Sequence, residues 1–271
     1  MPVLSSLRVY IHDLLASIKL ATDMRSRVRL VVDFTLSRFI EVLPKAMWNR
    51  RRQVCLRDDV KLVYRLNKGD LHSIREIWFE EDYWLPFESS SGVLLDLGAN
   101  IGMTSLWLSK KYKFTMVIAV EPDPTNAELV RDNLRLNSMN GQVLQAAIGP
   151  FEGTGRFKSS QVSNLGRLSD EGSLVQVLSV NAVIATFSIL RFALIKIDIE
   201  GGEESLFDGQ TEWLDRTDAM IMELHPDVVD CDRLRRIVSS HGFEYIPAHS
   251  RFPDNLPCFV RVAPPEPHQD G

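Results

Sequence analysis

Between residues 92 and 263, short apolar runs alternate with segments that have helical spacing. The runs are rich in Val, Ile, Leu, Ala and Met, and most of them end in glycine or polar residues. Strands buried on both faces of a parallel sheet have this composition, and alternation with helices indicates βαβ units. The pattern predicts an α/β fold with a mostly parallel sheet flanked by helices. Its strands are expected within residues 92–98, 114–122, 141–149, 192–202, 219–225, 243–248 and 257–263.

The first fifty or so residues have a helical pattern instead. Their apolar residues recur at spacings of three and four, which places them on one face of a helix. Basic residues are frequent in the same segment, including the run Arg50–Arg52. Two interpretations stay open: an appendage that packs on the body or on a second subunit, or a surface that lies on anionic lipid. Packing is preferred, because such a stripe more often forms core. The stripe consists of Leu4, Leu7, Ile11, Leu14 and Ile18.

A lead-in segment separates these helices from the main domain. Alternation over residues 60–66 predicts a strand, residues 67–69 predict a turn, and Asp70 is expected to cap a helix. The expected organisation is a helical appendage, the lead-in, the main domain and a disordered tail, at residues 1–54, 55–90, 91–263 and 264–271.

Composition narrows the partners and the compartment. The formal net charge of −5 argues against nucleic acid as the main partner, because phosphate binding usually requires a basic excess. The three cysteines have no zinc-ligand spacing and favour a reducing compartment. No apolar run approaches the ~18–20 residues of a membrane span. We expect a cytoplasmic protein, and we leave open a homo-oligomer and peripheral membrane contact through the basic helices.

The first predicted strand of the main domain leads into a glycine turn and then a helix. Ligands of open α/β sheets bind beyond the carboxyl ends of strands, where such a turn lets the backbone approach them. The dinucleotide pattern G-x-G-x-x-G has a further glycine where Asn100 stands here, and Asp96 precedes the turn. An acid at that point fits a cofactor with an amino group better than a pyrophosphate. The predicted cofactor-binding residues of this stretch are Asp96, Gly98, Ala99, Asn100, Gly102 and Thr104.

The second predicted strand ends in Glu121, about twenty residues after the glycine turn. A carboxylate at that place accepts hydrogen bonds from both hydroxyls of a ribose. Asp123 is expected to cap the next helix, and Pro124 to begin it. Glu121 and the adjacent Pro122 are therefore predicted to bind the cofactor.

Two later strands carry polar residues at their ends. Lys196, Asp198 and Glu200 point to one side of a strand, and charges in a buried run are costly unless they are paired or functional. We interpret Lys196 as a structural ion-pair partner of Asp198, Glu200 or Glu223, and the two acids as functional. Glu223 and His225 end the following strand, so the four acidic and imidazole side chains converge if the strands are neighbours. Such a cluster is a candidate reaction centre.

These motifs resemble the FkbM family of methyltransferases, whose members carry K-x-D-x-E-G-x-E on the fourth strand and E-x-H after the fifth. This chain has K-I-D-I-E-G-G-E at 196–203, E-L-H at 223–225 and the similar D-L-G-A-N-I-G at 96–102. The resemblance covers roughly residues 58–262. It implies a Rossmann-like class I methyltransferase fold with a seven-stranded sheet, and S-adenosylmethionine as donor. It also implies O-methylation of a sugar, a glycoconjugate or a polyketide-like natural product.

The resemblance suggests roles for the polar cluster. The sulfonium methyl is already activated, so the enzyme has mainly to align an acceptor oxygen behind the S–CH₃ bond and remove its proton. His225 is the preferred base, because an ordinary imidazole titrates near about 6.5, and Asp198 is second. Asp198 is also expected near the methionine end of the cofactor, and Ala147 beside the adenine. Glu200 is expected either to orient the acceptor or to help hold the site open. A divalent cation on the acids and His225 is the less favoured alternative.

Two other functions stay open: a nicotinamide-dependent oxidoreductase on the same fold, and a binding module without catalysis. The acceptor pocket is expected from the N-terminal helices and residues 150–180, with the loop at 163–166 beside it. Trp78, Tyr83 and Trp84 form either an aromatic wall for a sugar ring or the packing of the lead-in helix on the body.

Overall fold

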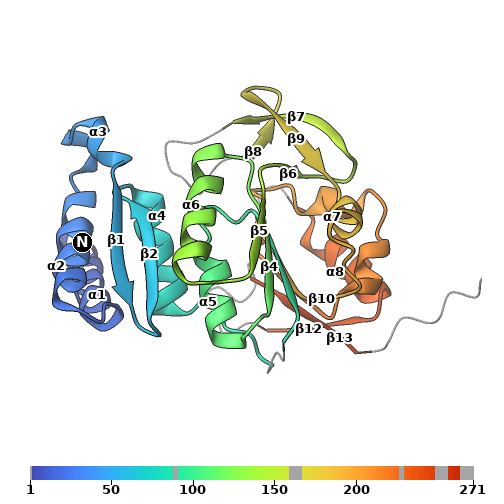
Figure 1. Ribbon diagram of the computed structural model, residues 1–271, viewed down its shortest axis with the longest axis horizontal. Helices are drawn as coiled ribbons and strands as arrows, with labels where there is room; N and C mark the ends of the chain where they lie inside the picture. Colours follow the sequence, from blue (N-terminus) through green and yellow to red (C-terminus); the bar gives the residue numbers. More distant parts are fainter. Residues whose placement is uncertain (1, 88–90, 159–166, 226–228, 248–255, 263–271) are drawn as a thin grey trace, which may run out of the picture.

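The computed structural model describes residues 2–87, 91–158, 167–225, 229–247 and 256–262. The large sheet has seven strands in the order β12-β13-β11-β10-β3-β4-β5 (Figure 1). All neighbours from β11 to β5 are parallel, and β13 is antiparallel to both β11 and β12. The predicted Rossmann-like class I fold is confirmed. The strands are β3 Val93–Leu97, β4 Met116–Val120, β5 Gly141–Leu144, β10 Phe192–Ile197, β11 Ala219–Met222, β12 Phe243–Ile246 and β13 Cys258–Arg261.

Helices cover both faces of this sheet, because successive strand residues point to opposite sides. Leu94 belongs to one hydrophobic cluster together with Leu106 and Leu129, whereas Leu95 belongs to another together with Val183 and Leu234. The first cluster lies under α5 (Met103–Tyr112) and α6 (Pro124–Leu136), the second under α7 (Val180–Phe187) and α8 (Cys231–Ser240). Two short 3-10 helices, η3 (Glu204–Phe207) and η4 (Glu212–Arg216), complete the second layer.

One predicted strand is split between two sheets. The apolar run at 141–149 forms β5 and then β6 (Ala147–Ile148), which leaves the large sheet and pairs with β9 (Ser173–Leu178). A four-stranded sheet results, in the order β6-β9-β7-β8, with β7 at Gly153–Lys158 and β8 at Arg167–Ser169. It lies beyond the upper end of β5 in Figure 1. An apolar run gives no signal of which sheet it joins.

A helical layer stands at the opposite end of the molecule from β12 and β13 (Figure 1). It contains α1 (Pro2–Leu20), α2 (Met24–Ser37), the 3-10 helix η1 (Ile40–Val42) and α3 (Lys45–Trp48). An antiparallel pair, β1 (Arg51–Leu56) and β2 (Val60–Arg65), lies between α2 and α6. Strand β1 was not predicted, and it crosses the expected boundary at residue 54. Among the described residues, no helix is long and apolar enough to cross a membrane.

The predicted packing stripe of the first helix is wrong in its described part. Ile11 and Ile18 are 48% and 52% exposed, whereas Ala16 and Leu20 are fully buried. The helix therefore packs through a face rotated away from the apolar stripe. A second helix, α2, lies against α1.

The lead-in connects this layer to the body. Helix α4 (Lys68–Ser73) begins at Asn67, whose side chain accepts from the Asp70 backbone N–H, so Asp70 is not the cap that was predicted. Asp70 instead forms a buried pair with Arg65, which also donates to Asn126 of α6. The chain continues as a π-helix, η2, at Ile74–Glu80. Such helices are rare and often occur at functional sites.

Candidate active site

A cavity of about 670 Å³ lies beyond the carboxyl ends of β3, β4 and β10, where open α/β sheets bind ligands. Its volume is within the usual range for small-molecule sites, about 300–1,000 Å³. The walls come from the turn after β3, the ends of β4 and β10, helix η2 and the small sheet. Predicted site residues among its lining are Gly98, Ala99, Asn100, Thr104, Glu121, Pro122, Ala147, Asp198, Glu200 and Glu223.

The glycine turn is shaped by contacts with neighbouring elements. Gly98 has φ +75°, and a Cβ there would lie 1.7 Å from the backbone oxygen of Asp198. Gly102 has φ +81°, and its Cβ would lie 3.2 Å from Val130 of α6. Gly102 does not line the cavity, and its glycine is explained by helix packing. Asn100 also adopts a left-handed conformation, with φ 50°.

Glu121 braces this turn from the end of β4. Its side chain is 4% exposed, and its two oxygens accept from the backbone N–H groups of Asn100 and Asp123, each at 2.8 Å. Burial raises the pKa of Glu121 to about 8, although these hydrogen bonds oppose the shift. Asn126 Nδ2 also donates to Oε1 at 3.4 Å, so the oxygen of Glu121 with a lone pair left for a ligand is Oε2.

Asp96 is placed differently from the prediction. It is fully buried, does not line the cavity, and accepts from Ser105 Oγ at 2.6 Å. Lys196 lies opposite it on β10, with Nζ 3.2 Å from Asp96 and 3.2 Å from Asp198. Burial alone would lower the pKa of Lys196, but the two carboxylates raise it above its usual value. Lys196 is therefore the predicted ion-pair partner, and it shields Asp96 from a ligand.

Asp198 and Glu223 form the polar wall of the cavity together with an aromatic residue. Tyr83 donates its hydroxyl to Glu223 Oε2 at 2.9 Å. Burial raises the pKa of Tyr83, and the Glu223 charge adds to the effect, so the phenol keeps its proton. Burial also raises the pKa of Asp198, helped by the charges of Glu223 and Glu200 and opposed by Lys196. The raised pKa makes Asp198 a stronger proton acceptor than an ordinary carboxylate.

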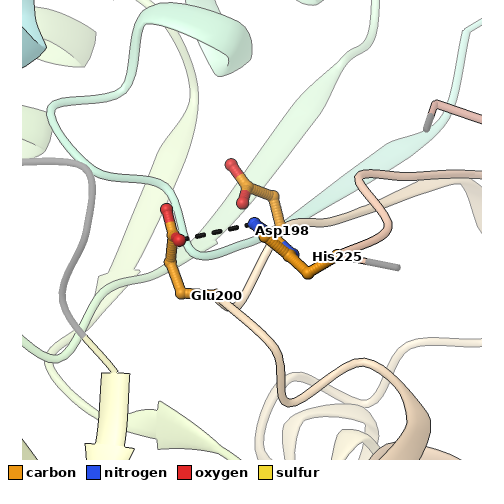
Figure 2. Close-up of side chains that lie close together, drawn as sticks. All are labelled: Asp198, Glu200 and His225. Atoms are coloured by element: carbon orange, nitrogen blue, oxygen red, sulfur yellow. Dashed lines mark ion pairs between the residues drawn. The ribbon is translucent and has the colours of Figure 1, made fainter. Parts of the chain in front are cut away.

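His225 is not among the residues that line the cavity. Figure 2 shows it beside Asp198 and Glu200. Its Nε2 is 3.4 Å from Glu200 Oε2, and its Nδ1 is 3.2 Å from Glu203 Oε1. The two glutamates raise the pKa of His225 to about 11. The imidazole is then protonated at neutral pH, so the ordinary pKa on which its choice as base depended does not apply.

The same group of side chains offers ligand atoms for a cation. One atom each from Asp198, Glu200 and His225 lies within 4.8 Å of the other two. Glu203, which is fully buried, orients the imidazole through Nδ1. Two carboxylates and one imidazole are ligands that a divalent cation accepts. Without a cation, the His225 imidazolium pairs with Glu200 and Glu203.

Several lining residues were not predicted from the sequence. Helices α4 and η2 contribute Ser73, Glu76 and Ile77, and the small sheet contributes Phe157 and Leu168. Of the three aromatic candidates, only Tyr83 lines the cavity.

Trp78 is 1% exposed in the core, and Trp84 packs against the same core. The predicted loop at 163–166 lies outside the described residues. The turn of the lead-in that carries Tyr83 toward Glu223 had no distinctive sequence signal.

Comparison with known proteins agrees with this architecture. A family model described as the methyltransferase FkbM domain matches residues 96–245. Methyltransferase 1 of Beauveria bassiana is 27% identical over 198 residues, which are 62% of this chain and 79% of that protein. Hexuronic acid methyltransferase AglP of Haloferax volcanii is 26% identical over 172 residues, which are 58% of this chain and 70% of that protein.

The fold has a crystallographic counterpart as well. The crystal structure of methyltransferase FkbM from Methylobacillus flagellatus superimposes with a TM-score of 0.50 at 17% identity. The alignment covers 94% of this chain but only 60% of that one. Because the family model matches more than half of the sequence, and the motifs at 96–102, 196–203 and 223–225 are present, this chain is a methyltransferase of the FkbM family.

Proposed function

We propose that the protein transfers the methyl group of S-adenosylmethionine to a hydroxyl oxygen of a sugar, glycoconjugate or natural product. The observation that carries the proposal is that residues assigned separately to donor binding and to chemistry line one cavity. Glu121 and the Gly98–Asn100 turn lie at the wall formed by β3 and β4, and Asp198, Glu200 and Glu223 follow β10 and β11.

The donor is expected to lie along the glycine turn. The ribose hydroxyls donate to Glu121, the adenine lies near Ala147, and the methionine end lies near Asp198. Asp96 is assigned a supporting role, because Lys196 and Ser105 already bind it. It fixes the lysine that in turn fixes Asp198.

Asp198 is the base that the geometry supports better than His225. Lys196 binds Oδ2 of Asp198, which leaves Oδ1 to accept the proton of the acceptor hydroxyl. As that proton moves to Asp198, the O–CH₃ bond forms, the S–CH₃ bond breaks, and S-adenosylhomocysteine is released. Positioned proton transfer typically contributes about 10²–10⁴-fold to the rate. The His225 imidazolium holds Glu200 beside the acceptor.

The charge of the cavity narrows the acceptor class. Among the described lining residues, carboxylates are numerous and Lys196, held by Asp96 and Asp198, is the one lysine or arginine. An acceptor with its own carboxylate near the reacting hydroxyl would be repelled. The Haloferax relative is a hexuronic acid methyltransferase, whereas for this chain we propose an uncharged polyol as the acceptor. The acids of the lining are Glu76, Asp82, Glu121, Asp170, Asp198, Glu200 and Glu223.

Calorimetric titration with S-adenosylhomocysteine tests the donor site. The wild type should bind with micromolar affinity, and Glu121→Gln should bind at least about tenfold more weakly, because a neutral amide accepts the ribose hydroxyls less strongly. Glu152→Gln, on the exposed loop before β7, is the matched control and should bind as the wild type does. If the folded wild type did not bind, S-adenosylmethionine would be rejected as the donor. The protein would then have to be tested as a nicotinamide-dependent oxidoreductase or as a binding module without catalysis.

Removal of metal ions tests the proposed direct transfer. Methyl transfer by protein dialysed against a chelator should equal that of untreated protein, because the His225 imidazolium already neutralises Glu200. Loss of activity that magnesium or manganese restores would instead assign a cation to Asp198, Glu200 and His225.

A further inference from the structure

The helical layer presents an unusual apolar surface to solvent. Of the fourteen large apolar side chains that are exposed in the described part of the chain, eight lie between residues 11 and 42. Six of them form what we call the outer face: Ile11, Leu15 and Ile18 on α1, and Met24, Val28 and Val32 on α2. Isolated exposed apolar residues are normal, but a concentration on two packed helices marks an interaction surface.

Spacing places these side chains on one face of each helix. They recur at intervals of four and three on α1 and of four on α2, and their exposed fractions range from 45% to 70%. The opposite face of each helix is already used for packing, with Leu20 and Leu30 fully buried. Each helix therefore has a second apolar stripe, which the fold of this chain leaves in solvent, and the two stripes together are the outer face.

Cations border the outer face. Lys19 and Arg25 are exposed and follow Ile18 and Met24 directly. Arg29 is half-buried and donates to the backbone oxygen of Gln53, so its charge is directed toward β1. Residues 1–56 contain ten Lys and Arg against four Asp and Glu, a net charge of +6, in a chain whose total is −5. Two of those four acids, Asp13 and Asp33, are buried. The layer is thus basic on a body that is strongly acidic.

We infer that the outer face docks the protein on an anionic lipid bilayer. Its apolar side chains enter the boundary between headgroups and acyl chains, and Lys19 and Arg25 bind lipid phosphates. A second copy of this chain fits less well, because a two-fold interface would bring the same cations against each other. An anionic bilayer attracts the basic helical layer and repels the acidic body. These opposite forces orient the molecule with its outer face toward the membrane.

Vesicle flotation tests the inference directly. The full chain should bind vesicles of phosphatidylcholine with about 30% phosphatidylglycerol at least about tenfold more tightly than vesicles of phosphatidylcholine alone. Lys19→Gln with Arg25→Gln should weaken that binding by about tenfold to thirtyfold, since each cation near an anionic surface strengthens binding by roughly fivefold. Raising the salt concentration should weaken wild-type binding, because it screens the attraction.

Charged substitutions distinguish vesicle binding through the outer face from nonspecific adsorption through any exposed apolar side chain. Leu15→Asp with Val28→Asp should reduce binding to anionic vesicles at least about tenfold, because both side chains would carry charge into the acyl boundary. Leu190→Asp, at a side chain that is 86% exposed on the body, should bind as the wild type does. Binding that Leu15→Asp with Val28→Asp leaves unchanged would overturn the inference. The inference would also be overturned if the wild type sedimented as a dimer and the same double variant as a monomer, because the outer face would then bind a second copy of the chain.

Discussion

Glu121 couples donor binding to pH at the scale of a single residue. Burial holds its pKa at about 8, so near pH 7 the free protein carries a proton that ribose hydroxyls would displace. Binding of S-adenosylhomocysteine near pH 7 should therefore release up to about one proton. Affinity should rise by up to about tenfold per unit between about pH 6 and pH 8, and then level off. Calorimetry in two buffers of different ionisation enthalpy measures the proton released.

The matched variant is Glu121→Gln, which should bind weakly without releasing a proton. A proton release that persists in this variant would place the titration on another group, such as Asp198. The same shift acts on folding: because the folded pKa exceeds the ordinary value, the contribution of Glu121 to the free energy of unfolding falls as pH rises from about 4.5 to 8.

Lys196 is the second residue with a measurable consequence. It lies between Asp96 and Asp198 with a side chain that is 2% exposed. Lys196→Met should lower the free energy of unfolding by about 3–5 kcal/mol, because it leaves the buried Asp96 and the half-buried Asp198 without a cation. Urea unfolding followed by tryptophan fluorescence measures the loss. Adding Asp96→Asn should recover part of it, and no recovery would mean that the pair does not act as a unit.

Positions of site residues were predictable from the sequence, but their environments were not. Glu121, Asp198 and Glu223 were recognised because they end apolar strands, and carboxyl ends of parallel strands meet at one edge of the sheet. The shielding of Asp96 depends on the register that sets Lys196 opposite it. The high pKa of His225 depends on how residues 200–203 fold back toward it, and no local pattern encodes that.

The turn after β3 can be tested at the scale of elements. Gly98→Ala should cost more than about 3 kcal/mol in the free energy of unfolding or prevent folding, because φ is +75° and the new Cβ would overlap the Asp198 carbonyl. Gly153→Ala, where a Cβ meets no atom within 4 Å, should change it by less than about 0.5 kcal/mol. Equal stability of the two variants by chemical denaturation would contradict the packing described for the turn.

The cap of α6 and the strands of the large sheet were predicted correctly, whereas the cap at Asp70 and the packing stripe of the first helix were not. Asp123 accepts from the backbone N–H groups of residues 125 and 126 and begins α6 with Pro124, as expected. The strands of the large sheet match their apolar runs. Strand β1, with its sequence RRQVCL, has no clear alternation, and the division into β5 and β6 occurs within one apolar run. Both depend on partners that are distant in sequence.

At the scale of the whole molecule, the helical layer and the body share one core. A single hydrophobic cluster contains Ala16 and Leu30 of the layer together with Leu94 and Leu106 of the body. The full chain should therefore unfold in one transition, with fluorescence and circular dichroism coincident. A chain that lacks residues 1–50 should be less stable by several kcal/mol, because buried core would be exposed. Two separated transitions, with ligand raising only one, would show independent folding of the layer.

The cavity is lined by two separate stretches of the chain. The family model begins at residue 96, whereas Ser73, Glu76, Ile77 and Tyr83, which line the cavity, come earlier in the sequence. On the proposed arrangement, the residues that bind the donor lie within the family model, so they can evolve at a different rate from these four lining residues. A genetic crossover near residue 90 would exchange substrate preference between relatives and leave the inherited donor machinery intact.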